Sequence, residues 1–143
     1  SINDPRVIYE ETAVRSNNWG HSIRSEWLQK VEGDFVVITN QDNYYSPVFI
    51  EKALQHFGKY PNLVAAYSAQ IVHNYTDYKV MDCRLRRGYI DCGQVMLRTK
   101  EAAFVGWRDI VSHSSDWFFF NDIITEYGAL RFTPFSGLHF FHN

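Results

Sequence analysis

The chain has 143 residues, 45% of them hydrophobic and 17% aromatic, so it has the size of one ordinary domain and can bury a substantial core. Its 14 basic and 16 acidic residues give a formal net charge of −2 without a long run of either sign, which argues against nucleic acid or a membrane surface as the main partner. No apolar run approaches the ~20 residues that span a bilayer. We therefore expect one soluble, cytoplasmic domain over residues 1–143, with any membrane association supplied by a larger parent protein.

Extended segments and helices alternate along the chain. Segments rich in β-branched and aromatic residues predict strands, at residues 6–10, 35–39, 63–73, 89–98 and 130–141. Apolar residues at helical spacing predict helices, at residues 21–31, 46–59, 99–105 and 116–127. Residues 74–88 are polar and arginine-bearing, so we expect a loop with weak extended structure there. The two cysteines, Cys83 and Cys92, are too few for a disulfide framework, and we expect buried free thiols.

Local signals at the helix ends support this alternation. Ser46 and Pro47 supply an N-cap and a proline at the first helical position, and Gly128 is typical of a helix C-terminus. Strands that alternate with helices predict an α/β fold in which helices flank a mainly parallel sheet. The continuous apolar run at residues 35–39 is typical of a strand buried on both faces, so we expect it in the interior of the sheet.

A polar burst follows this apolar run directly, at residues 40–43. In open α/β sheets the ligand lies beyond the carboxyl ends of the strands, where such a burst would be placed. Asp42 offers a carboxylate oxygen and Asn40 an amide oxygen, which suits Mg²⁺ or Mn²⁺ held mostly by the phosphates of a ligand. The alternative is that asparagine and aspartate simply form a turn before the next helix.

The segment "NNWGHSIRSEWLQKVEGDFVVITNQDNYYSPVFIEKAL", residues 17–54, resembles family 2 glycosyltransferases of the GT-A fold. In that family an asparagine-x-glycine turn, an "ARN" helix and a "G-D" pair lead into a metal-binding DxD motif. Asn40-Gln41-Asp42 stands at the DxD position, with asparagine in place of the first aspartate. One negative charge therefore replaces two, which should weaken metal binding in the absence of nucleotide.

The second half of the chain carries a similar resemblance. "YIDCGQVMLRTKEAAFVGW" is similar to the family's mid-domain strand and helix, which implies that Gly93 lets the backbone approach donor or acceptor sugar. "SSDWFFFNDIITEYG" resembles the helix that carries the catalytic base, which implies that role for Asp116, with Ser115 where glutamate is usual. Trp117 would then line the acceptor side. Without the resemblance, Asp116 is a helix N-terminal acid favoured by the helix dipole, and Trp117 is a core residue.

The closing "GLHFFHN" resembles the family's terminal strand, whose histidine completes the metal and diphosphate shell. This implies His142 as a metal ligand beside Asp42 and Asn40, although a histidine among aromatic residues is commonly just packed. Arg84 and Arg87 belong to the one dense basic patch of the sequence, where they could neutralise a diphosphate. The alternative for this patch is a solvated loop.

The resemblance implies an inverting glycosyltransferase that uses a UDP- or GDP-sugar donor, a saccharide or other hydroxyl acceptor, and Mn²⁺ or Mg²⁺. Family members begin with a nucleotide-binding half that has no counterpart in residues 1–143. We therefore expect a partial GT-A fold, incomplete at its N-terminus, that could be inactive as the isolated chain. The alternatives are a non-catalytic sugar- or protein-binding module and, less favoured, a nucleotidyltransferase.

Overall fold

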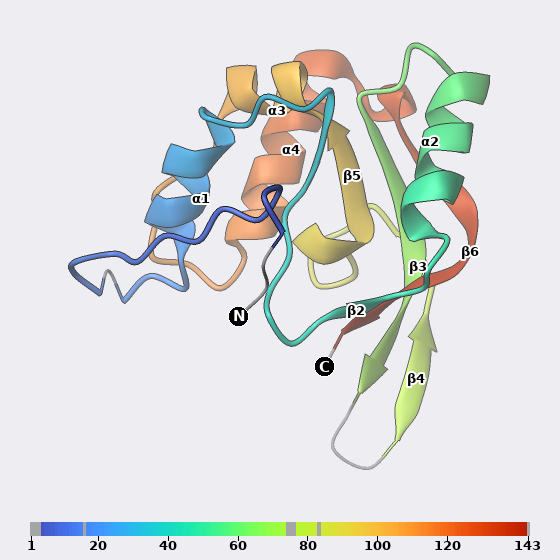
Figure 1. Cartoon of the computed structure of the whole chain (residues 1–143). Helices are drawn as coiled ribbons and strands as arrows, with labels where there is room; N and C mark the ends of the chain where they lie inside the picture. The colour runs from blue at the N-terminus through green and yellow to red at the C-terminus, as the bar shows by residue number, and fades with distance from the viewer. Residues whose placement is uncertain (1–3, 16, 74–76, 83, 143) are drawn as a thin grey trace.

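The computed structural model describes residues 4–15, 17–73, 77–82 and 84–142. Within these ranges the chain forms a six-stranded sheet with helices against both faces (Figure 1). The strands are β1 (Phe35–Val37), β2 (Tyr44–Tyr45), β3 (Ala65–His73), β4 (Tyr78–Met81), β5 (Val95–Arg98) and β6 (Phe132–His142). The helices are α1 (His21–Leu28), α2 (Phe49–Lys59), α3 (Thr99–Val105) and α4 (Ser115–Tyr127), and the two 3-10 turns are η1 (Cys92–Gln94) and η2 (Ala129–Arg131).

The sheet is mixed and mostly antiparallel. Its strands lie in the order β1-β5-β3-β6-β2, and β4 pairs with β3. Among the strand pairs of the described residues, β3 with β6 is parallel and the other four are antiparallel. The prediction of a mainly parallel, GT-A type sheet was therefore wrong. Alternation of apolar patterns locates strands and helices, but the direction of each strand depends on its partner across the sheet, for which the local pattern carries no signal.

β1 lies at one edge of the sheet, where it pairs only with β5 among the described strands. The prediction that residues 35–39 form an interior strand was also wrong, and the strand ends at Val37. Phe35 and Val37 pack into the core on one face of the sheet, whereas Val36 packs into the core on the other. The run is apolar because both faces of this edge are covered, although strands do not flank it on both sides.

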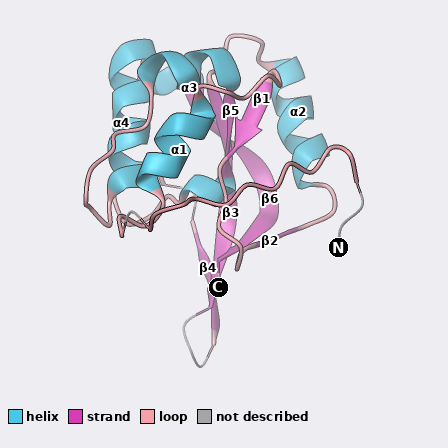
Figure 2. Cartoon of the chain, turned by 60° about the vertical axis from the view of Figure 1, so that its left-hand side comes forward, coloured by secondary structure: helices cyan, strands magenta, loops and turns pink. Residues whose placement is uncertain are grey.

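The two faces of the sheet carry separate cores. Figure 2 shows α1, α3 and α4 over one face and α2 over the other. Successive residues of β5 divide between them, as the two-residue period of a strand requires: Val95 and Leu97 join the aromatic core beneath α4, and Met96 joins the core beneath α2. Phe119 and Phe120 of α4 fill much of the first core, and Phe49 of α2 anchors the second.

β6 has an irregular register that turns its end toward a second partner. Its pairing with β3 shifts after Tyr67 pairs with Pro134. Pro134 has no N–H to donate to a ladder, and Gly137 has a φ of 111°, which L side chains rarely adopt. Beyond this irregularity β6 pairs with both β3 and β2 and ends at His142. His142 and the loop that joins β1 to β2 line the same cleft.

Smaller differences from the sequence-based expectations concern single elements. Residues 6–10 do not form a strand, and residues 78–81, expected in a loop with weak extended structure, form the regular strand β4. Cys92 is a buried free thiol, as predicted, whereas Cys83 lies outside the described residues. In the described ranges, none of the helices is long and apolar enough to cross a membrane.

Candidate functional site

A cleft of about 730 Å³ opens beyond the ends of β1 and β6, beside the first turns of α1 and α4. Four residues singled out from the sequence line it, namely Asn40, Asp42, Asp116 and His142. They come from three separate parts of the chain: the β1–β2 loop supplies the first two, α4 the third and β6 the fourth. Asp42 and His142 therefore share one cleft despite their separation in sequence, and their chemical roles stay predictions.

The polar burst after β1 forms a turn along one wall of this cleft. The turn is closed by a backbone hydrogen bond of 3.4 Å from the Asn43 N–H to the Asn40 carbonyl oxygen. The Asn40 side-chain oxygen accepts a hydrogen bond of 2.6 Å from Nη2 of Arg24, which comes from α1 and also lines the cleft. Asp42 is exposed at the rim. The burst is thus both a turn and a lining of the cleft, so the two interpretations of its sequence are compatible.

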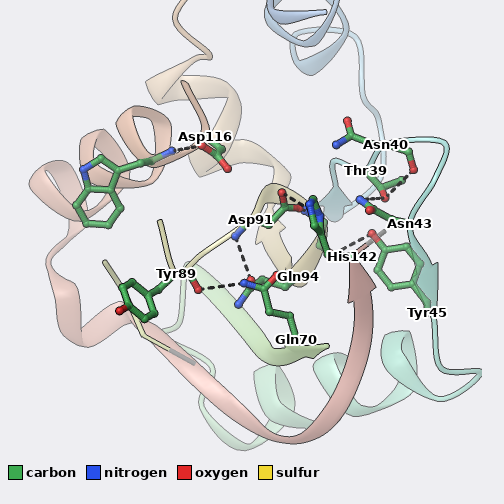
Figure 3. A network of polar contacts seen from close by, with 12 residues as sticks. Thr39, Asn40, Asn43, Tyr45, Gln70, Tyr89, Asp91, Gln94, Asp116 and His142 are labelled. Atoms are coloured by element: carbon green, nitrogen blue, oxygen red, sulfur yellow. Dashed lines mark hydrogen bonds and ion pairs between the residues drawn. The ribbon is translucent and has the colours of Figure 1, made fainter. Parts of the chain in front are cut away.

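Asp116 lies in the first turn of α4 and faces the cleft. Its Oδ1 accepts a hydrogen bond of 2.8 Å from the backbone N–H of Trp117 (Figure 3). Burial is the largest cause that raises the pKa of Asp116 to about 6, with a further contribution from Asp91, while the Trp117 N–H and Arg24 act in the opposite direction. A carboxylate with such a pKa is mostly ionised at neutral pH and still accepts a proton readily, as a general base must.

Asp91 is a cleft residue that the sequence interpretation missed. It caps η1: its Oδ1 accepts a hydrogen bond of 2.7 Å from the Gly93 N–H, and the Gln94 side chain accepts one of 3.0 Å from the Asp91 N–H. Its other oxygen, Oδ2, lies 3.7 Å from Nδ1 of His142 (Figure 3). An aspartate followed three residues later by glutamine is a capping-box signal, so the sequence did contain a means of locating this rigid carboxylate.

A smaller cavity of about 250 Å³ adjoins the cleft. Asp91, His113, Asp116 and His142 line both spaces, so these four side chains form the boundary between them. Trp117 lines the smaller cavity, as does Arg87, whose Nε donates a hydrogen bond of 3.0 Å to the Ser114 hydroxyl. Asp116 therefore lies where the two spaces meet.

Two residues singled out from the sequence line neither cavity. Arg84 is exposed and pairs with Asp82 at 3.3 Å. Gly93 is buried, and a Cβ atom there would lie 2.5 Å from the Phe140 ring. Its carbonyl oxygen accepts a hydrogen bond of 2.9 Å from the Tyr45 hydroxyl. Close packing against β6 accounts for this glycine without any contact to a sugar.

The contacts of the predicted metal ligands bear on whether they could bind a metal ion. Nδ1 of His142 is buried and has no hydrogen-bond partner in the described structure, and Oδ2 of Asp91 lies 3.7 Å from it. The Asn40 oxygen, in contrast, faces the guanidinium of Arg24, and a divalent cation there would be repelled by this charge. Among the described residues, no group of three or more histidine, cysteine, aspartate or glutamate side chains is arranged to hold a metal ion. The roles of Asp42, Asn40 and His142 as metal ligands, and the binding of Mn²⁺ or Mg²⁺, stay predictions.

The sequence was compared with known proteins. No model of a known protein family matches it, and no curated protein matches it either. The function of the cleft must therefore be inferred from its own side chains.

Proposed function

We propose that the protein transfers a sugar from a nucleoside-diphosphate sugar, a UDP- or GDP-sugar, to a hydroxyl group of an acceptor. The observation that carries this proposal is the position of Asp116, a partly buried carboxylate between two adjoining cavities, with its pKa raised to about 6. A reaction between a donor in one space and an acceptor in the other needs a proton acceptor at their boundary. The resemblance of the sequence to family 2 glycosyltransferases supports the same reaction.

The chemical step assigns one task to Asp116. Its carboxylate takes the proton of the acceptor hydroxyl while the hydroxyl oxygen attacks the anomeric carbon of the donor. The bond between that carbon and the diphosphate oxygen breaks, and the bonding electrons leave with the diphosphate. Because the attack is a single displacement from the opposite side, the configuration of the anomeric carbon inverts.

The two spaces suit two substrates of different size. The cleft of about 730 Å³ lies in the range of ordinary small-molecule sites, and a nucleoside-diphosphate sugar is a ligand of that class. The cavity of about 250 Å³ would hold the acceptor group. Trp117 supplies an aromatic surface there, against which a sugar ring can pack. Arg87 adds a hydrogen-bond donor on the same side.

Nucleoside-diphosphate release from a panel of UDP- and GDP-sugars tests the proposal, with simple saccharides as acceptors and with Mn²⁺ or EDTA present. Asp116→Asn preserves the shape of the side chain but removes its basicity, so turnover should fall by the ~10²- to 10⁴-fold typical of a lost general base. Asp122→Asn is the matched control, because Asp122 lies on the same helix and pairs with Arg108 away from both cavities. Equal rates for Asp116→Asn and the unmodified protein would remove Asp116 from the reaction.

A non-catalytic sugar-binding module is the second candidate, and Ser115 is the observation in its favour. Ser115 stands where the family usually has glutamate, and it is only 1% exposed, with a hydroxyl that has no hydrogen-bond partner in the described structure. A glutamate could not be accommodated there without rearrangement. Binding of a sugar or nucleotide sugar without release of nucleoside diphosphate, under any donor and metal tested, would favour this candidate.

A further inference from the structure

Arg24 is a positively charged residue in the cleft whose direct contacts are neutral or aromatic. It is partly buried in α1, and its guanidinium lies 5.3 Å from the centre of the Trp107 ring. One Nη donates to the Asn40 side-chain oxygen at 2.6 Å, and the other lies 3.2 Å from Nδ1 of His21. None of the described carboxylates forms an ion pair with Arg24.

This environment holds the guanidinium in place without a direct ion pair, although its charge also acts on Asp116 and opposes the rise in the pKa of that group. Partly buried charges are normally paired, because removing a charge from water is costly. Asn40 is decisive in this respect, since its neutral amide orients Arg24, whereas an aspartate would form an ion pair with it. The positive charge therefore remains directed at the cleft, which it also lines.

We propose that Arg24 binds and neutralises the diphosphate of the donor, so that donor binding does not require a divalent cation. This inference rests on the proposed function and specifies how the donor is held. A guanidinium has five N–H donors in a planar fork that matches phosphate oxygens. Two of its nitrogens are directed at Asn40 and His21, which leaves further N–H groups for the phosphate oxygens.

The same contact disfavours a metal ion at the Asn40 oxygen. A guanidinium at the Asn40 oxygen opposes the binding of a divalent cation to that oxygen, because both groups are positively charged. The leaving diphosphate develops negative charge as the sugar bond breaks. A cation already fixed in the cleft stabilises that charge without reorganisation. In this arrangement the side chain of Arg24 performs the task that a metal ion would otherwise perform.

Calorimetric titrations with three probes, inorganic pyrophosphate, UDP and GDP, test the inference, each in EDTA and in Mn²⁺. The unmodified protein should bind pyrophosphate and at least one of the two nucleotides in EDTA, with little change on adding Mn²⁺. Arg24→Gln should weaken binding in EDTA by about 10- to 100-fold, as expected for losing charged hydrogen bonds. Arg131→Gln is the matched control, since Arg131 donates to the backbone carbonyl oxygen of Asn62 and lies over the Tyr127 ring, but outside the cleft.

Asn40→Asp provides a second variant that keeps the shape of the site. Its new carboxylate should pair with Arg24, weaken pyrophosphate binding in EDTA, and make binding respond to Mn²⁺. Binding that requires Mn²⁺ and is equal in Arg24→Gln and the unmodified protein would overturn the inference while leaving the proposed function intact. Binding of pyrophosphate in EDTA without binding of UDP or GDP would support the role of Arg24 in holding a diphosphate but contradict the proposed function. Absence of binding with every probe would refute both.

Discussion

Replacing Asp116 by asparagine should stabilise the protein at neutral pH. In the folded chain the pKa of Asp116 rises from 3.8 to about 6, chiefly because burial disfavours its charged form. In the unfolded chain the same group ionises at its ordinary pKa. Above pH 6 the folded protein must hold a carboxylate in a place that disfavours charge, and asparagine removes that requirement while it can still accept the Trp117 N–H.

The expected gain in stability follows from the rise in the pKa of Asp116. A rise of about two units corresponds to about 3 kcal/mol, at ~1.4 kcal/mol per unit. Asp116 keeps some contact with solvent, which screens the charge, so we expect about 1–3 kcal/mol. The direction of the pH dependence follows from the two pKa values. Below about pH 4 the Asp116 carboxyl group is protonated in both the folded and the unfolded chain, so it does not lower the free energy of unfolding. As the pH rises to about 6 the unfolded chain ionises first, and the loss of stability caused by Asp116 grows. Because asparagine does not titrate, the difference in the free energy of unfolding between Asp116→Asn and the unmodified protein should grow over the same pH range.

Urea denaturation of both proteins between pH 4.5 and 8 measures this difference. The free energy of unfolding of Asp116→Asn, relative to the unmodified protein, should rise with pH and level off above about pH 6.5. Asp122→Asn should show no such gain, because it removes an exposed ion pair with Arg108. A difference that is constant over this range, or that falls with pH, would refute the assigned pKa and with it the basis for a general base at this position. A gain in stability together with a loss of turnover is the pattern expected of a functional residue.

Three further predictions concern other residues near the cleft. Gly93→Ala should destabilise the fold by about 1–3 kcal/mol in urea denaturation, because the new methyl group would meet the fully buried Phe140 ring; an unchanged midpoint would contradict the packing role. Asp91→Asn should lower the pKa of Asp116, since the Asp91 charge helps to raise it. The acid limb of the pH–rate profile should then move to lower pH, and an unmoved limb would exclude an effect of the Asp91 charge on Asp116. Burial raises the pKa of the Cys92 thiol, so iodoacetamide should label it only after unfolding, as peptide mass spectrometry would show.

Parts of the fold could be predicted because their signals are local. The helix at residues 99–105 and the helix that ends before Gly128 follow from apolar spacing and a C-terminal glycine, both within a few residues of each element. Strand direction could not be predicted in this way. The apolar run at Phe35 suggested an interior strand, yet coverage of both faces produces the same pattern at an edge. The strand β4 was missed because it lies in a polar segment and gains its order from pairing with β3.

In the candidate site, too, some residues could be predicted from the sequence and others could not. The sequence indicated Asp42, Asp116 and His142, and the fold brings all three to one cleft. Asp91 was missed although a capping box marks it, and Arg24 entered only as part of the segment that resembles the "ARN" helix. The contacts that the structure gives these two residues involve partners far away in sequence: Asn40 orients Arg24, and His142 lies beside Asp91. Such pairings depend on the irregular end of β6 and on the packing of α1, which no short motif encodes.

The pH dependence of donor turnover tests the central claim most directly. For the donor and acceptor that give nucleoside-diphosphate release, kcat/KM should be measured between pH 4.5 and 8.5 for the unmodified protein and for Asp116→Asn. The account predicts a rate that falls on the acid side with an apparent pKa of about 6 in the unmodified protein. This limb should be absent in the residual activity of Asp116→Asn. A profile that is flat from pH 5 to 8, or an identical limb in both proteins, would contradict the assignment of Asp116 as the base.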